Sequence, residues 1–244
     1  MNAFDERIAR ADELASRSSA AADALRFYSH LAQFQKRVFE ELNAYGETDA
    51  SVLVRYFPAL LEMVRSSAPT TLAGFSEADL TTELILAEWT GTPPESEHAR
   101  FFARAVVQPF AESLAMRGTV ATESTPSTCP FCSAKPVVAV LRGEGGGGKR
   151  WLLCCMCATE WAFRRLVCPN CGEEDKTRLP VYTTPEFKHV RVEACDSCRT
   201  YIKAVDLTVD GHAVPVVDEI ASIALNIWAA EHDYSKLESN ILGM

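Results

Sequence analysis

The chain has 244 residues, of which 48% are hydrophobic, and a formal net charge of −9 at pH 7. This length suits one large domain or two of ordinary size, and the apolar content is sufficient for a buried core. No run approaches the roughly 20 apolar residues that a membrane span needs, and the acidic balance disfavours a nucleic-acid-binding surface.

The start of the chain, residues 1–6, has neither a basic region nor an apolar region of the kind that opens a secretory signal. We therefore expect a cytoplasmic protein. A reducing compartment keeps cysteines as thiols, which favours metal binding over disulfides.

A helical domain is expected over residues 1–122. Apolar side chains recur there at steps of three or four, which places them on one face of a helix that Gly46 should end. They are Phe27, Leu31, Phe34, Val38, Leu42 and Tyr45. A second helix is predicted at about 50–66, kinked or split by Pro58.

Two further helices are predicted before a linker. The residues Ser76-Glu77-Ala78-Asp79 resemble a capping box that opens a third helix ending near Trp89. Thr92 and Pro93 suit the start of a fourth helix, which should run to Leu114 with a bend at Pro109. Residues 119–128 lack periodicity and are interpreted as a linker.

Eight of the nine cysteines form four Cys-x-x-Cys pairs within 70 residues, and the pairs are separated by 21, 10 and 23 residues. Each long gap fits one zinc-ribbon or rubredoxin-type unit, in which two thiolate pairs close a tetrahedral site of four sulfurs. The pattern therefore predicts two tandem four-cysteine units, at 123–166 and 167–208.

The repeat assigns four ligands to each metal ion. The first set is Cys129, Cys132, Cys154 and Cys157, and the second is Cys168, Cys171, Cys195 and Cys198. Pairing across the units and disulfide formation are the alternatives. A closed site of four thiolates suits zinc and iron alike, and it leaves no open position for Lewis-acid catalysis or water activation.

The two units share a plan of about 40 residues. Strands are expected at 136–141, 150–153 and 160–166 in the first unit, and at 179–183, 189–194 and 201–207 in the second. The glycines at 145–148 are interpreted as a hairpin turn, and Thr159 and Thr200 follow the last cysteine of each unit at the same offset.

The ninth cysteine, Cys155, aligns with Asp196 at an offset that is not a ligand position. We expect a partly exposed free thiol; an alternative ligand or a redox partner is the other hypothesis. His189 is expected to be a surface strand residue. The sequence contains no recognisable nucleophile–base pair, carboxylate pair or phosphate loop, so we expect a protein that is not an enzyme.

The C-terminal part, 209–244, is predicted to contain a helix that begins near Ala213. Its apolar face should comprise Ile220, Ile223, Ala224, Ile227 and Trp228. The predicted fold class is thus α plus small β: a helical domain, two tandem rubredoxin-like or zinc-ribbon units, and a C-terminal helical tail.

These features resemble the formate dehydrogenase accessory protein family, FdhE. The four cysteine pairs carry the resemblance together with the segment Cys157–Trp161, the stretch 213–218 and the closing residues Tyr234 and Asn240–Gly243. The resemblance extends over nearly the whole chain. Two departures are that Cys155 stands where the family has a serine and that family members have a longer N-terminus.

The resemblance implies a cytoplasmic, non-catalytic maturation factor that contacts the catalytic subunit of a respiratory formate dehydrogenase before export. It also implies that the eight paired cysteines hold two metal ions and favours iron over zinc. The oligomeric state is left open, with a homodimer as one option. The alternatives are a rubredoxin-like redox or electron-transfer protein and, less favoured by the charge, a nucleic-acid-binding zinc ribbon.

Overall fold

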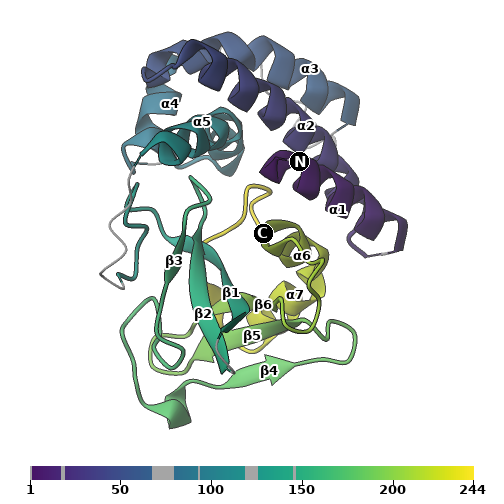
Figure 1. Cartoon of the computed structure of the whole chain (residues 1–244), viewed down its shortest axis with the longest axis vertical. Helices are drawn as coiled ribbons and strands as arrows, with labels where there is room; N and C mark the ends of the chain where they lie inside the picture. Colours follow the sequence, from purple (N-terminus) through teal and green to yellow (C-terminus); the bar gives the residue numbers. More distant parts are fainter. Residues whose placement is uncertain (1, 18–19, 68–79, 93, 119–125, 145–146) are drawn as a thin grey trace.

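The computed structural model describes residues 2–17, 20–67, 80–92, 94–118, 126–144 and 147–244. Helices of the first half form one layer, and a sheet formed by the second half lies below it (Figure 1). The helices of the first layer are α1 (Ala3–Arg17), α2 (Ala22–Tyr45), the 3-10 helix η1 (Ala50–Tyr56), α3 (Phe57–Ser67), α4 (Thr82–Trp89) and α5 (Glu97–Arg117). The predicted order of a helical domain, two four-cysteine units and a C-terminal helical part is confirmed.

Helix α2 buries most of the apolar residues that were predicted to share one of its faces. Its members from Phe27 to Leu42 are buried, and Gly46 ends the helix in the left-handed conformation with φ of 64°. The amide of Gly46 donates to the carbonyls of the last turn, which satisfies groups left free at a helix end. Tyr45, the last member of the predicted stripe, is 78% exposed and is also the last residue of the helix.

The predicted helix at 50–66 is split at Pro58, as expected: η1 ends at Tyr56 and α3 begins at Phe57. Proline is tolerated there because the first turn of a helix needs no amide donor. The predicted capping box at 76–79 lies outside the described residues, and α4 begins later, after Thr81.

The predicted start of the fourth helix at Thr92 was wrong. Helix α5 begins at Glu97, because the hydroxyl of Ser96 accepts a hydrogen bond from the amide of Ala99 at 3.4 Å and caps the helix there. Pro109 lies inside α5, at the predicted position.

All strands of the described residues belong to one sheet of seven strands. They are β1 (Pro136–Glu144), β2 (Gly147–Cys154), β3 (Glu160–Ala162), β4 (Val181–Thr183), β5 (Val190–Cys195), β6 (Thr200–Asp206) and β7 (Ser235–Lys236). The order is β3-β2-β1-β6-β5-β4, and β7 pairs with β6. Strand β1 of the first unit and β6 of the second pair in parallel, so the two four-cysteine units share a continuous sheet.

Strand β3 is shorter than predicted, because the chain turns after Ala162. The buried side chain of Arg150 holds this turn by donating to the carbonyl of Arg164 at 3.1 Å. The same guanidinium lies 2.8 Å from Glu193 on β5, so one buried cation links the two units.

The predicted C-terminal helix is broken at Ser222 into α6 (Pro215–Ala221) and α7 (Ile223–Glu231). The fully buried ammonium of Lys203 explains the break, because it donates to the carbonyls of Glu219 and Ser222. The break changes the face that α7 presents to the core. Leu225 is buried, whereas Ile227 of the predicted apolar face is 59% exposed.

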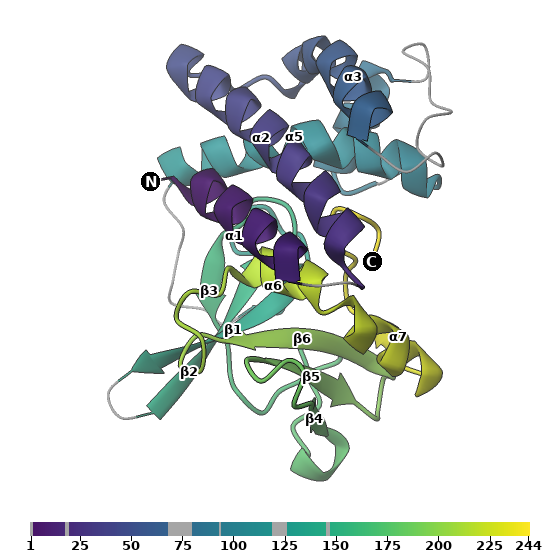
Figure 2. The ribbon, with the colours of Figure 1, turned by 90° about the vertical axis from the view of Figure 1, so that its right-hand side faces the viewer.

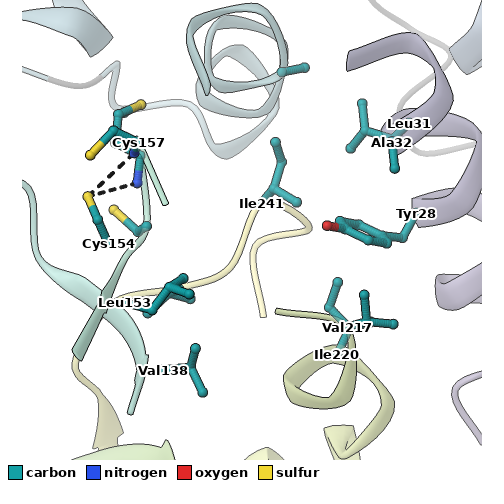
Figure 3. Close-up of a cluster of buried hydrophobic side chains, with 14 of the residues drawn as sticks. Tyr28, Leu31, Ala32, Val138, Leu153, Cys154, Cys157, Val217, Ile220 and Ile241 are labelled. Atoms are coloured by element: carbon teal, nitrogen blue, oxygen red, sulfur yellow. Dashed lines mark hydrogen bonds between the residues drawn. The ribbon is translucent and has the colours of Figure 1, made fainter. Parts of the chain in front are cut away.

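Helix α6 lies between the helical layer and the sheet, in contact with α1 and α2 above and with β1 and β6 below (Figure 2). Val217 and Ile220 of α6 pack towards Tyr28 of α2, and Ile241 completes the same buried cluster (Figure 3). The core is therefore continuous from the helices to the first four-cysteine unit. None of the helices in the described parts of the chain has the length and apolar character needed to cross a membrane.

Candidate metal centres

The structure gathers the eight paired cysteines into two clusters of four. Within each cluster the sulfur atoms all lie within 4.8 Å of one another, and the members are those that the repeat assigns to each unit. All nine cysteines lie in the described residues, and all are free thiols.

The spacing of the sulfurs fits a tetrahedral site. In the first cluster, the sulfurs of Cys129 and Cys157 are 3.5 Å apart, and those of Cys132 and Cys154 are 3.4 Å apart. Sulfurs about 2.3 Å from a central ion would be separated by about 3.8 Å along each tetrahedron edge, whereas a disulfide would bring them to about 2.05 Å. The first cluster has the donor set and size of a closed site for zinc or iron.

The second cluster has the same form. The sulfur of Cys168 lies 3.7 Å from that of Cys198, and the sulfur of Cys171 lies 3.7 Å from that of Cys195. With four thiols around each centre, both sites could hold a metal ion without an open coordination position. Binding of an ion at these residues, and its identity as iron or zinc, stay predictions.

Each Cys-x-x-Cys segment is a tight turn that ends in the left-handed conformation. The residues after the second cysteines are Ser133, Ala158, Gly172 and Arg199, with φ of 62°, 52°, 77° and 55°. Only glycine adopts this conformation without a steric penalty, yet three of the four positions hold other residues. The local geometry is thus maintained at a cost of about 1 kcal/mol or more at each such position.

This geometry turns backbone amides towards the sulfurs. The amide of Phe131 lies 3.4 Å from the Cys129 sulfur, and that of Met156 lies 3.3 Å from the Cys154 sulfur (Figure 3 shows the Cys154 turn). In the second unit the amide of Asn170 lies 3.4 Å from the Cys168 sulfur. Amide hydrogen bonds spread the charge of a thiolate and fix its orientation, which is how ligands of a metal are commonly supported.

The two clusters differ in exposure. Three cysteines of the first cluster are buried and Cys132 is half-buried, whereas Cys171 of the second is exposed and Cys198 half-buried. Burial acts to raise the pKa of Cys198, but hydrogen bonds from Thr200 and Asn170 outweigh it and lower the pKa to about 6. The pKa of Cys195 in the same cluster is raised, chiefly by burial, so the thiols of this cluster do not ionise alike.

Cys155 belongs to neither cluster, and the expectation of a partly exposed thiol was wrong: its exposure is 8%. Its backbone joins the first unit to the helices, because its carbonyl accepts a hydrogen bond from the Gln108 side chain at 2.7 Å. Its amide donates to the carbonyl of Lys135 at 3.1 Å. The structure gives Cys155 a place at the junction of α5 and the first unit.

A third group, which sequence reasoning missed, brings His189, Asp210 and Asp218 together. The histidine was expected on the surface, but its Nε2 lies 2.8 Å from the buried carboxylate of Asp218. Arg10 of α1 lies 2.6 Å from Asp218 and 2.9 Å from Asp210, so its guanidinium supplies positive charge at this group. Arg10 and these carboxylates lie about 200 positions apart in the chain, and no local sequence pattern signals their contact.

Comparison with known proteins finds family matches in the part of the chain that contains both cysteine clusters. Residues 128–165 match the family model "FdhE, central domain", and residues 166–242 match "FdhE, C-terminal domain". An FdhE homologue of Aquifex aeolicus is 35% identical over 146 residues, which cover 59% of this chain and 52% of the relative. One of Pseudomonas aeruginosa is 36% identical over 131 residues, 51% of this chain and 42% of the relative.

The matched region thus spans about half the length, or less, of these curated relatives. A homologue of Haemophilus ducreyi is 24% identical over 93% of this chain and 84% of its own length. The crystal structure of the FdhE protein from Pseudomonas aeruginosa has a TM-score of 0.75 at 24% identity and covers 98% of this chain and 95% of its own, which establishes the shared fold. From its two matched domains and its homologues, the part of the chain from residue 128 to residue 242 belongs to the FdhE family.

Proposed function

We propose that the protein is a cytoplasmic accessory factor for the maturation of a respiratory formate dehydrogenase, and that it binds the catalytic subunit through its metal-stabilised double ribbon. Membership of the FdhE family and the two closed four-cysteine clusters support this proposal. The single observation that carries the metal part is the set of sulfur separations of 3.4–3.7 Å in both clusters.

A closed site favours a structural role over catalysis. Four thiolates fill the coordination sphere, so substrate or water has no position at the ion. Metal binding then adds directly to the stability of the fold, by an apparent contribution of about 10–16 kcal/mol in small zinc-binding peptides. We therefore propose that the protein has no catalytic activity of its own and that the ions, iron by family resemblance or zinc, rigidify a docking surface.

Capture of the dehydrogenase catalytic subunit by the full-length protein tests the proposal. Wild type should retain the subunit, and Cys129→Ser and Cys195→Ser should each lose it together with one metal ion. Arg17→Ala is a suitable control, because its side chain is 70% exposed and distant in sequence from the ribbons. Undiminished capture by both cysteine variants would exclude the ribbons from the interaction.

A second candidate is a rubredoxin-like electron carrier, which the exposure of Cys171 in the second cluster favours. A solvent-facing ligand shortens the path for an electron to a partner protein. An anaerobic redox titration distinguishes the two functions. A reversible colour change typical of iron held by four cysteines supports the carrier, and a colourless zinc protein rules it out.

A further inference from the structure

The C-terminal segment, residues 232–244, connects the second four-cysteine cluster to the helical layer. It follows α7, pairs with β6 through β7, and continues upward to the helices (Figures 1 and 2). The proposed function does not involve this path.

Arg199 is the main contact between the turn and the segment. It follows Cys198 directly, and its guanidinium donates to the carbonyl of His232 at 2.6 Å and to that of Asp233 at 3.3 Å. The same guanidinium lies over the ring of Tyr234, 4.1 Å from its centre. The amide of Arg199 donates to the carbonyl of Cys195 at 2.9 Å, so its left-handed conformation, with φ of 55°, is part of the turn that the cysteines form.

A second set of contacts joins the same two parts. The hydroxyl of Tyr234 donates at 2.5 Å to Asp196, which lies between the two cysteines of the turn. The amide of Ser235 donates to the carbonyl of Arg199 at 2.8 Å, and that of Leu237 donates to the carbonyl of Tyr201 at 2.9 Å. The turn therefore holds the segment by side chains and by backbone.

The far end of the segment is fixed to the helices. Glu238 lies 2.8 Å from Arg100 and 3.0 Å from Arg104, both on α5. The carbonyl of Ser239 accepts a hydrogen bond from Arg104 at 3.1 Å, and Ile241 is buried at the junction of the layers (Figure 3). The segment also forms one wall of a cavity of about 400 Å³ whose other walls include Phe27 of α2 and Phe101 of α5.

We infer that metal binding at the second four-cysteine cluster controls the docking of segment 232–244 onto the helical layer. The metal fixes the Cys195–Cys198 turn, the turn orients Asp196 and Arg199, and these two residues hold the segment. The ion thereby sets the shape of the cavity beside α5. The inference rests on the proposed metal binding at this cluster and adds to it a regulated position of the segment.

Linkage makes the effect reciprocal: if the metal stabilises the docked segment, the docked segment must strengthen binding of the metal. Couplings of this kind change affinity by about 5-fold to 150-fold. Two measurements on the full-length, anaerobically purified protein test this linkage. One follows the segment after a metal ligand is changed, and the other follows metal binding after a contact with the segment is changed.

Hydrogen exchange measures how the loss of a metal ligand affects the segment. Cys171→Ser removes a ligand of the second cluster, and Cys132→Ser is the matched change in the first. The amides of Ser235 and Leu237 should exchange at least about tenfold faster in the Cys171 variant than in wild type, and at the wild-type rate in the Cys132 variant. Unchanged exchange of both amides in the Cys171 variant, with one metal ion lost, would overturn the inference.

Equilibrium competition with a chelator measures metal affinity when the contact with the segment is changed, and it leaves every cysteine in place. Arg199→Ala should bind one of its two metal ions at least about fivefold more weakly than wild type. Arg164→Ala is the control, because the side chain of this arginine is 60% exposed and pairs with Glu174. Wild-type affinity for both ions in the Arg199 variant would overturn the inference even if the cysteine variant unfolded. Wild type that carries no metal would instead overturn the proposed metal binding, and this inference with it.

Discussion

The hydroxyl of Thr200 lies 2.9 Å from the sulfur of Cys198. Thr159 stands in the same relation to Cys157 in the first cluster, at 3.1 Å. Both threonines come two residues after the last cysteine of their unit, so the sequence repeat is also a repeat of sulfur environment. When the thiols bind a metal as thiolates, these hydroxyls become donors to the sulfurs and support them.

Replacing one threonine should therefore weaken one site only. Thr200→Val keeps the shape of the side chain but removes the donor, and supporting groups of this kind change metal affinity by about 10-fold to 100-fold. We expect faster extraction of one of two metal ions by a chelator, with the first site unaffected. Thr159→Val should weaken metal binding at the first site and leave the second site unaffected. If either variant weakened both sites equally, the repeat of sulfur environment would be contradicted.

The contact of Arg10 with Asp218 should stabilise the junction between α1 and α6. Arg10 is 7% exposed and Asp218 is 1% exposed, and removing the guanidinium leaves the buried carboxylate without its permanently charged partner. Arg10→Ala should lower the free energy of unfolding by about 3–5 kcal/mol in chemical denaturation. Arg17→Ala, on the exposed end of the same helix, should change it by less than about 0.5 kcal/mol. Similar small effects of both variants would mean that Arg10 does not hold the layers together.

The helical stripe of α2 and the cysteine repeat were predictable because each is a local pattern with a fixed period. The stripe from Phe27 to Leu42 must share one face of a helix, and paired cysteines must come together if each unit repeats the plan of the other. The same reasoning predicted a strand in each of the six regions that hold β1 to β6.

Long-range pairing could not be read from the sequence. The parallel contact of β1 with β6 joins segments about 65 residues apart, and neither strand carries a mark of its partner. The break of the last helix at Ser222 depends on Lys203, a lysine between the apolar residues Ile202 and Ala204 of β6. Arg10 and His189 likewise find their carboxylate partners only in the folded chain. The division of the chain at residues 122, 166 and 208 stays a prediction, and the shared sheet is the main reason to test it.

Glu219 gives the fold a specific dependence on pH. Burial acts to raise the pKa of Glu219, but the ammonium groups of Lys203 and Lys236 lower it from 4.5 to about 2. Because the pKa is lower in the folded protein, the carboxylate stabilises the fold above pH 4.5 and loses this contribution as the pH falls towards 2. A shift of this size corresponds to about 3 kcal/mol.

Glu219→Gln should therefore be less stable than wild type by about 3 kcal/mol at pH 7, and the difference should narrow below about pH 4.5. Chemical denaturation of both proteins from about pH 7 to about pH 3 measures this difference directly. A difference that stays constant over the whole range would show that the carboxylate is not the titrating group.

The turn after Cys171 provides a test of local geometry. Gly172 has φ of 77° and open space where a Cβ would lie, so Gly172→Ala would meet a conformational penalty without a clash. We expect a loss of about 1 kcal/mol in unfolding free energy. Gly211→Ala is the control, because Gly211 does not have a positive φ and a Cβ there makes an ordinary contact with the Leu207 carbonyl. Equal stability of the Gly172 variant and wild type would contradict the role of the left-handed residue.

Metal analysis of anaerobically purified protein tests whether the eight paired cysteines hold two metal ions. With the absorption spectrum and the intact mass, it reports how many ions the chain holds, whether they are iron or zinc, and whether the cysteines are reduced. We predict two ions per chain in wild type and one in either Cys129→Ser or Cys195→Ser, with all nine cysteines of the wild-type chain as thiols after metal removal. A folded wild-type protein with no metal, or with paired cysteines oxidised to disulfides, would contradict it.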